Sequence, residues 1–143
     1  MLFRSVFDRT ARLPATSFLG RTAGETPTLL VTANTTKLSA DLVRSGVKSV
    51  TAHDLGDALR QLRGRGIASI LVEGGAGLAA SFLAGGYVDR LVIFRAPIVL
   101  GGGALGAFSA IAPLDIEQAP RFELLDVRKL GDDVMTVYAA RKP

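Results

Sequence analysis

Cysteine is absent from the 143-residue chain, and histidine occurs once, at His53. A disulfide framework and a thiolate zinc site are therefore both excluded. His53 stands beside a predicted helix start, and we interpret it as a surface residue rather than as a ligand or a catalytic base. No metal ion is expected in this protein.

The chain also lacks the apolar run of roughly 18–20 residues that a membrane helix needs. Its most apolar stretch, "SILVEGGAGLAASFLAGGY" at 69–87, is interrupted by Glu73 and is rich in glycine. The apolar part of the first ten residues is too short for a secretory signal. We therefore predict a cytoplasmic protein without a membrane segment.

Aromatic residues are few, at 6%, and they are not interleaved with the basic residues that give a net charge of +4. The one basic cluster, Arg60, Arg63 and Arg65, has helical spacing and suits a solvated helix end. Without a stacking platform for bases, a nucleic-acid partner is not expected. Hydrophobic residues make up 48% of the chain. This share is within the globular range, but the mean hydropathy of +0.33 is positive, which favours exposed apolar surface and a partner subunit that we expect to be a second copy.

What is present is an alternation of strand and helix patterns, in a length that suits a single domain over residues 1–143. Apolar runs predict strands at 27–33, 47–52, 67–72 and 89–100, with helical patterns between them at 38–46, 54–66 and 76–86. Such alternation predicts a three-layer α/β fold, in which helices cover both faces of a mostly parallel sheet. The first 26 residues contain a short strand pattern, "SVF" at 5–7, and otherwise resemble a loop.

Local signals support the ends of these helices. Ser39 precedes a helical pattern and suits the N-cap position, where a side-chain oxygen accepts from a free backbone amide. Gly46 follows the same pattern and suits the left-handed conformation that ends many helices. Asp54 opens the next helical pattern, and Gly66 ends it.

The alternation stops after residue 100. The segment "LGGGALG" at 100–106 has no clear helix signal directly after it, and we interpret it as a flexible loop. Residues 121–143 form two alternating runs joined at Gly131, Asp132 and Asp133, which is a hairpin signal. The predicted fold is therefore α/β with an added C-terminal antiparallel hairpin.

A glycine turn, formed by Gly74, Gly75, Ala76 and Gly77, joins the third predicted strand to the third helix. Missing side chains let a ligand approach the backbone, and a helix start offers free amides to an anion. Ligands of open parallel sheets also bind beyond the carboxyl ends of the strands. The spacing matches neither a dinucleotide fingerprint nor a P-loop, so a phosphate-binding turn and a merely tight turn both remain open.

Two charged residues add to this picture. Glu73 ends an otherwise apolar strand, where an acidic residue is rarely needed for packing. Its carboxylate could accept hydrogen bonds from a neighbouring loop, but next to the glycine turn we favour an anchor for a hydroxyl or amide of a bound small molecule. Arg12, together with Arg9, flanks a loop and could hold a substrate phosphate in bidentate fashion. A solvated loop arginine is the alternative.

At this point the chain resembles a known family, the C-terminal reductase domain of the bifunctional riboflavin-biosynthesis deaminase/reductase. The similarity covers almost the whole chain in the same order. The matching segments are "VFDRTARLPATSFL" at 6–19, "PTLLVT" at 27–32, "VEGGA" at 72–76, "GYVDRL" at 86–91, "APIVLGG" at 96–102 and "FELLDVRKLGDDVMTVY" at 122–138.

The resemblance implies a fold like that of dihydrofolate reductase. It also implies an NADPH-dependent reduction of a ribosylamino-pyrimidinone 5′-phosphate to its ribitylamino form, and a homodimer. By position, the glycine turn would hold the cofactor pyrophosphate, Glu73 would face the sugar-derived part of the substrate, and Thr32 would lie near the adenosine end of the cofactor. No catalytic side chain is implied, because hydride transfer mainly requires orientation of the two reactants.

The chain also departs from the family pattern. A first strand with an Asp-Gly-Arg-type substrate motif and a Gly-x-x-Thr cofactor turn are not visible before residue 6, so we expect an N-terminally shortened domain. The zinc deaminase half is excluded, because that chemistry needs cysteine ligands. A non-catalytic nucleotide-binding module, or a self-associating module that has lost part of the active site, is therefore the alternative to an active reductase.

Overall fold

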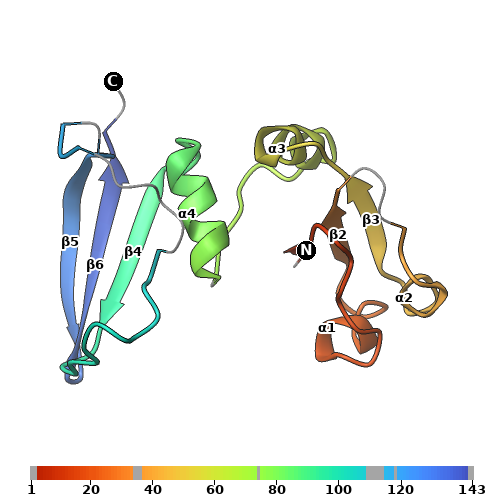
Figure 1. Ribbon diagram of the computed structural model, residues 1–143, viewed down its shortest axis with the longest axis horizontal. Helices are drawn as coiled ribbons and strands as arrows, with labels where there is room; N and C mark the ends of the chain where they lie inside the picture. The colour runs from red at the N-terminus through yellow and green to blue at the C-terminus, as the bar shows by residue number, and fades with distance from the viewer. Residues whose placement is uncertain (1–2, 34–36, 74, 109–114, 118, 142–143) are drawn as a thin grey trace. The chain divides into compact units, whose positions relative to one another are not determined.

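A computed structural model describes residues 3–33, 37–73, 75–108, 115–117 and 119–141 of the chain (Figure 1). The chain divides into two compact units, Met1–Leu71 and Val72–Pro143. No helix in the described ranges combines the length and the apolar character that crossing a bilayer requires.

The first unit is built on a parallel sheet of three strands in the order β1-β2-β3. The strands are β1 (Arg4–Phe7), β2 (Thr28–Thr32) and β3 (Lys48–Thr51). All five residues of β2 are buried, as expected for an apolar, β-branched run that occupies the centre of a covered sheet. The predicted strands at 27–33 and 47–52 are thereby confirmed, and the "SVF" pattern is part of β1.

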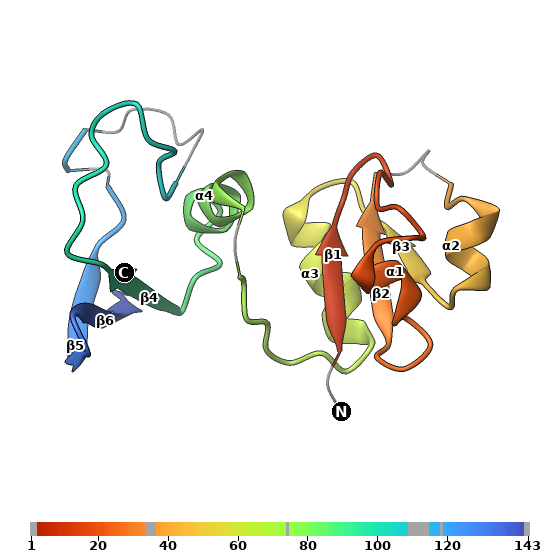
Figure 2. The ribbon, with the colours of Figure 1, turned by 90° about the horizontal axis from the view of Figure 1, so that it is seen from below.

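Helices cover both faces of this sheet (Figure 2). The helices are α1 (Phe18–Arg21), α2 (Ala40–Arg44) and α3 (Leu55–Gly64). Leu29 and Val31 of β2 pack with Leu62 of α3 on one face. Leu30, which points the other way, packs with Leu42 of α2. Because side chains alternate along β2, they contribute to two separate cores, one on each face of the sheet. The predicted three layers are therefore present in this unit.

The three helices of the first unit each begin with a side-chain cap. Ser17 Oγ accepts from the Gly20 amide, Ser39 Oγ from Leu42, and Asp54 Oδ1 from Asp57, at 3.2, 3.3 and 2.7 Å. Gly46 and Gly66 follow α2 and α3 with φ of +93° and +84°. The cap at Ser39 and the left-handed Gly46 were predicted and are confirmed, and the predicted helix between Asp54 and Gly66 is α3.

The described residues of the second unit form one helix and an antiparallel sheet in the order β4-β6-β5. Its elements are α4 (Ala76–Ala84), β4 (Arg90–Arg95), β5 (Phe122–Leu130) and β6 (Asp133–Ala140). Strands β5 and β6 form the predicted hairpin, in which Leu130 pairs with Asp133 and Gly131 adopts φ +63°. The register of β5 shifts between Leu124 and Asp126, so Leu125 is an extra residue in the strand.

Three expectations about the strands and loops need correction. Residues 67–72 form no strand, although Ile67 and Ile70 pack against the α3 side of the first unit. The apolar side chains of Ile67 and Ile70 explain their packing, but a strand also needs a neighbouring strand to bond with. Leu71, in the same apolar run, is 80% exposed. The strand predicted at 89–100 is limited to β4, and it pairs antiparallel with β6 rather than joining the parallel sheet. The segment interpreted as an N-terminal loop contains the short helix α1.

Candidate functional site

The glycine turn leads into α4. Gly74 lies outside the described residues. Gly75 is the N-cap of α4 and adopts φ +81°, a conformation that side-chain-bearing residues rarely take. A Cβ atom built on Gly75 would meet only Leu78 Cβ, at 3.8 Å. Glycine is therefore favoured here by the backbone conformation, and the space beside it is open.

The start of α4 differs from the starts of the other helices. Within the described residues its N-cap, Gly75, has no side-chain cap hydrogen bond, and its first turn has no acidic residue. The first amides of a helix have no partner four residues back, so Ala76, Gly77 and Leu78 depend on something outside the helix backbone. Gly75 and Gly77 are both exposed. The helix start can thus offer several amides and its positive dipole end to an anion.

Glu73 precedes this turn and is exposed. Within the described residues it makes no hydrogen bond or ion pair, so the alternative of a carboxylate held by a neighbouring loop gains no support. Its oxygens are open to a ligand's hydroxyl or amide donors.

Thr32 is the last residue of β2, and its side chain is turned into the protein. The residue is 2% exposed, and its hydroxyl donates to the Val50 carbonyl at 3.5 Å. Its own carbonyl accepts from the Ala52 amide at 2.9 Å. The hydroxyl therefore serves the sheet, and Thr32 marks the carboxyl end of β2 rather than a free donor.

Arg12 lies in the loop that follows β1, and its side chain is 85% exposed. Its Nε is 3.7 Å from Asp8 Oδ1. This loop is tied to the end of β2, because Ala33 donates its backbone N–H to the Arg9 carbonyl at 3.0 Å. Arg12 and Thr32 therefore belong to the same edge of the parallel sheet, the one formed by the carboxyl ends of its strands.

Asp8 was not predicted as a site residue. Its side chain is 11% exposed, and its Oδ2 accepts from the Leu13 amide at 2.9 Å. Its Oδ1 is buried and accepts no hydrogen bond from any residue that the structure describes. A buried carboxylate oxygen without a donor is costly, which distinguishes Asp8 from an ordinary loop residue. The sequence signal was available, since Asp8 ends a strand pattern just as Glu73 ends an apolar run.

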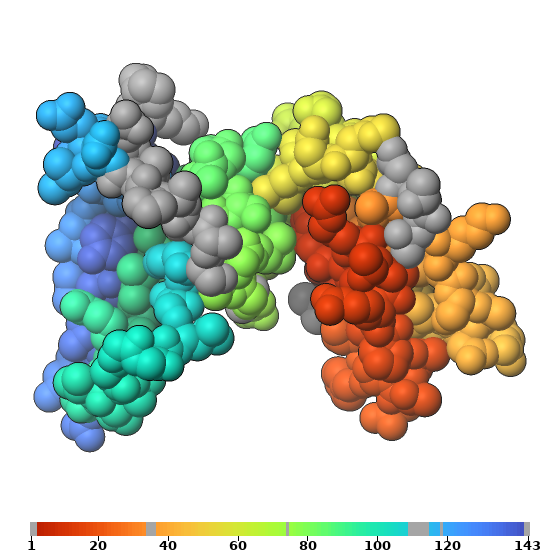
Figure 3. Space-filling model, in the orientation of Figure 1, coloured from red at the N-terminus to blue at the C-terminus, as the bar shows by residue number. Residues whose placement is uncertain are grey.

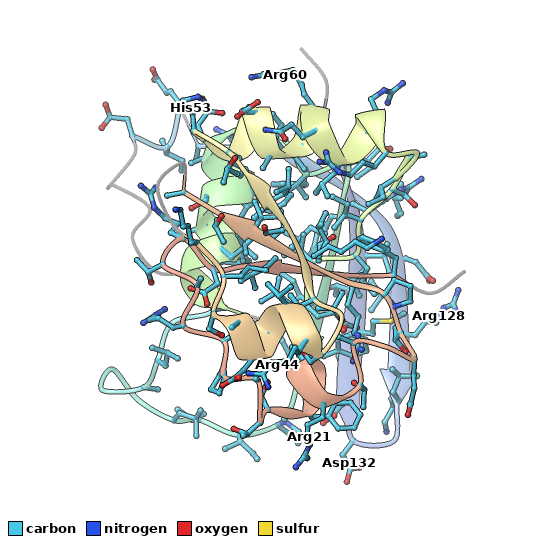
Figure 4. The ribbon with its side chains drawn as sticks, turned by 90° about the vertical axis from the view of Figure 1, so that its right-hand side faces the viewer. Arg21, Arg44, His53, Arg60, Arg128 and Asp132 are labelled. Atoms are coloured by element: carbon cyan, nitrogen blue, oxygen red, sulfur yellow. The ribbon has the colours of Figure 1, made fainter. Side chains whose placement is uncertain are left out.

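His53 follows β3 at the same edge and is exposed, as predicted. Figure 4 shows His53 and Arg60 at one end of the unit, with Arg21 and Arg44 at the other. The backbone N–H of His53 donates to Asp57 Oδ2 at 3.0 Å. This hydrogen bond holds the pKa of Asp57 below its ordinary value, with smaller lowering contributions from Gln61 and Arg60. The lowered pKa of Asp57 is therefore explained by hydrogen bonds at the start of α3 and does not indicate a ligand site.

A hollow of about 290 Å³ lies at the opposite edge of this sheet, beside the amino ends of β2 and β3. Its only charged lining residue is Lys48, and glycine and apolar side chains form most of the wall. None of the predicted site residues lines it. Among the described residues, no group of three or more histidine, aspartate or glutamate side chains could hold a metal ion.

The elements define an α/β protein with a helix-covered parallel sheet and a C-terminal antiparallel hairpin. The family model for the RibD C-terminal domain matches residues 2–136, and the chain belongs to this family. The resemblance drawn from the sequence motifs is thereby confirmed.

Relatives and solved structures agree with this assignment. The chain is 28% identical over 116 residues to the riboflavin biosynthesis protein RibD of Aquifex aeolicus, covering 80% of this chain and 32% of that protein. It is 33% identical over 103 residues to the 2,5-diamino-6-ribosylamino-4(3H)-pyrimidinone 5′-phosphate reductase of Methanothermobacter thermautotrophicus, covering 71% and 46%. Acinetobacter baumannii RibD superposes with a TM-score of 0.80 at 27% identity, over 97% of this chain and 37% of that one. The chain thus spans less than half the length of these proteins.

Proposed function

We propose that the chain is a single reductase domain that uses NADPH to convert a ribosylamino-pyrimidinone 5′-phosphate to its ribitylamino form. The observation that carries this proposal is the start of α4, where the first helix amides follow a left-handed glycine that provides no side-chain cap in the described part of the chain. Membership of the RibD C-terminal domain family, and a relative named for this reduction, support it.

The residues of the α4 start fit a diphosphate. The backbone N–H groups of Ala76 and Gly77 would donate to its oxygens, and the dipole of α4 would favour its negative charge. Gly74 and Gly75 would allow the diphosphate to approach the backbone, because no side chain stands in the way. The bound nicotinamide would supply the hydride.

Other side chains would orient the two ligands. Glu73, exposed and without a partner in the described ranges, would accept hydrogen bonds from the hydroxyls of the substrate's sugar-derived part. Arg12 would pair with the substrate phosphate through two parallel N–H groups. Thr32, the last residue of β2, would lie near the adenosine part of the cofactor. Its hydroxyl is hydrogen-bonded to the Val50 carbonyl, so the end of the strand, and not the hydroxyl, would be beside the adenosine.

Two further expectations belong to this proposal. A cytoplasmic location suits a chain without cysteine. A homodimer suits the exposed apolar side chains of β4 and β5, such as Val92, Phe94 and Val127.

A titration of the purified chain with NADPH, followed by nicotinamide fluorescence, tests the binding step. Addition of the pyrimidine substrate then tests turnover, through loss of NADPH absorbance. We expect saturable binding and substrate-dependent oxidation. Binding without oxidation would favour the non-catalytic nucleotide-binding module, and a chain that associates without binding NADPH would favour the self-associating one.

A further inference from the structure

Strand β5 is the outer strand of its sheet, and among the residues the structure describes β6 is its only ladder partner (Figure 1). Two hydrogen bonds show which way the backbone groups point. Ala140 donates to the Asp89 carbonyl, beside β4, and Arg141 donates to the Arg121 carbonyl, beside β5. Because these directions alternate along a strand, odd-numbered residues of β6 bond with β5.

The register then separates the residues of β5 into two sets. Those opposite odd-numbered residues of β6 bond inward, and they are Glu123, Asp126, Arg128 and Leu130. Those opposite even-numbered residues turn their N–H and C=O groups outward, and they are Phe122, Leu124, Val127 and Lys129. The outward set contains Leu124 and Val127, which are 53% and 54% exposed. Figure 3 shows the β5 side chains on the surface of the second unit. An edge of this kind is a template for another strand.

The extra residue Leu125 determines which strand fits. In a regular strand, residues three positions apart point to opposite edges. Because Leu125 is inserted, Leu124 and Val127 both point outward. A second copy related by a two-fold axis can therefore pair its Val127 with Leu124, and its Leu124 with Val127. The axis would pass between Leu125 and Asp126, with the two irregularities facing each other.

Charge selects the same register. The pairing of Leu124 with Val127 places Glu123 opposite Arg128 of the second copy, in a non-hydrogen-bonded pair, where opposite side chains are closest. A slip of two residues would instead place Glu123 opposite Asp126 or Leu130, which gives repulsion or no partner. Arg128 already holds Asp126 of its own chain through Nε at 2.6 Å, and the guanidinium has further N–H donors for a second carboxylate.

We propose that two copies of this chain join through their β5 strands, antiparallel and about a two-fold axis, to form one continuous antiparallel sheet. The second copy is the occupant because the edge is complementary to itself in both hydrogen bonding and charge. This inference rests on the homodimer in the proposed function, and it is independent of NADPH binding.

Charge reversal tests the interface in the full chain by sedimentation equilibrium. Glu123→Arg places the new arginine opposite Arg128 of the second copy, and the two-fold axis repeats this repulsive pair once more. We therefore expect the dimer dissociation constant to rise at least about tenfold. Arg128→Glu should have a similar effect, and the two changes combined should recover most of the dimer. Asp132→Arg, at the hairpin turn (Figure 4), makes the same charge change away from the edge and should leave the dissociation constant unchanged.

Cross-linking tests the register, since the chain has no native cysteine. Residues 123 and 128 of one chain are about 16 Å apart along the strand, too far for a disulfide, which needs Cα atoms within about 7 Å. Glu123→Cys combined with Arg128→Cys should therefore form a covalent dimer on a non-reducing gel. Glu123→Cys combined with Leu130→Cys, the slipped register, should remain monomeric on the gel.

The outcomes separate the claims. A native chain that sediments as a monomer overturns both the homodimer and this interface, whatever the NADPH titration gives. A dimer that tolerates both charge reversals, or that cross-links equally well in the slipped register, overturns the β5 interface alone. Loss of NADPH binding with an intact, charge-sensitive dimer overturns the enzymatic proposal and leaves the interface standing.

Discussion

The two units of the chain use their apolar residues differently. Among the described residues, every buried apolar side chain except Ala80 and Phe82 belongs to the first unit. The exposed large apolar side chains, by contrast, lie mostly in the second unit, and they include Val92 and Phe94 of β4 and Val127 of β5. The apolar residues of the first unit form its own core, whereas many of those in the second unit remain exposed.

The helix starts show the same difference. The first-turn amides of α1, α2 and α3 are each satisfied in part by a serine or aspartate side chain, whereas α4 begins with glycine and no side-chain cap. A capped start contributes to stability, and an uncapped one retains donors for a ligand. The comparison teaches that polar side chains stabilise the helix starts of the first unit, whereas the start of α4 in the second unit has no side-chain cap in the part of the chain that the structure describes.

The largest effect on this comparison should come from Leu30→Ala. Leu30 is fully buried in β2, and its truncation should lower the free energy of unfolding by about 2–5 kcal/mol. The same change at Leu100, which is 78% exposed in the second unit, should cost under about 0.5 kcal/mol. Urea denaturation followed by circular dichroism measures both. Equal losses would show that the two units do not differ in this way.

Gly75→Asp should abolish NADPH binding while leaving the fold largely intact. The new side chain would enter the open space at the α4 start, block the approach of the diphosphate and repel its charge. Gly66→Asp, just after α3, is the matched control and should bind normally, because Gly66 also has a left-handed φ, of +84°, and a Cβ there meets nothing within 4 Å. Fluorescence titration with NADPH compares the two variants with the parent. Undiminished binding by Gly75→Asp would show that the glycine turn does not bind the diphosphate.

A smaller loss should follow removal of a cap from the first unit. Asp54→Ala leaves the Asp57 amide, now 2.7 Å from Asp54 Oδ1, without its acceptor. We expect the free energy of unfolding to fall by about 1 kcal/mol, with NADPH affinity unchanged. A drop in NADPH affinity would instead indicate that the start of α3 contributes to ligand binding.

The smallest expected effect concerns pH. The pKa of Asp57 is lowered in the folded chain, chiefly by the hydrogen bond from the His53 amide. Ionised Asp57 therefore adds stability above its unfolded pKa, and this contribution is lost as the pH falls through the folded value. Below about pH 4, Asp57→Asn should show a shallower fall of the thermal midpoint than the parent. Asp132→Asn, in the hairpin turn, is the control, and identical slopes for parent and Asp57→Asn would contradict the expectation.

The sequence predicted the features that depend on neighbouring residues. Ser39, Asp54 and Gly46 act through groups within a few positions, and the turn at Gly131 joins two strands that are adjacent in sequence. Residues 67–72 were wrongly predicted as a strand, because a strand needs a ladder partner elsewhere in the chain, which an apolar run does not specify.

The candidate site follows the same division. The glycine turn indicated that a helix would follow it, and α4 does begin there, at Ala76. The sequence did not reveal that the Thr32 hydroxyl would be turned toward the Val50 carbonyl, nor that Asp8 would bury an oxygen without a donor. Both depend on packing between segments that are distant in sequence.

The central claim is that the amides at the start of α4 bind the diphosphate of a nicotinamide cofactor. An amide-resolved NMR titration of the isotopically labelled chain with NADPH tests it most directly. The account predicts saturable shifts that are largest at the amides of Ala76 and Gly77 and that disappear in Gly75→Asp. Shifts confined to the hollow around Gly24 and Lys48, with the α4 amides unmoved, would contradict it.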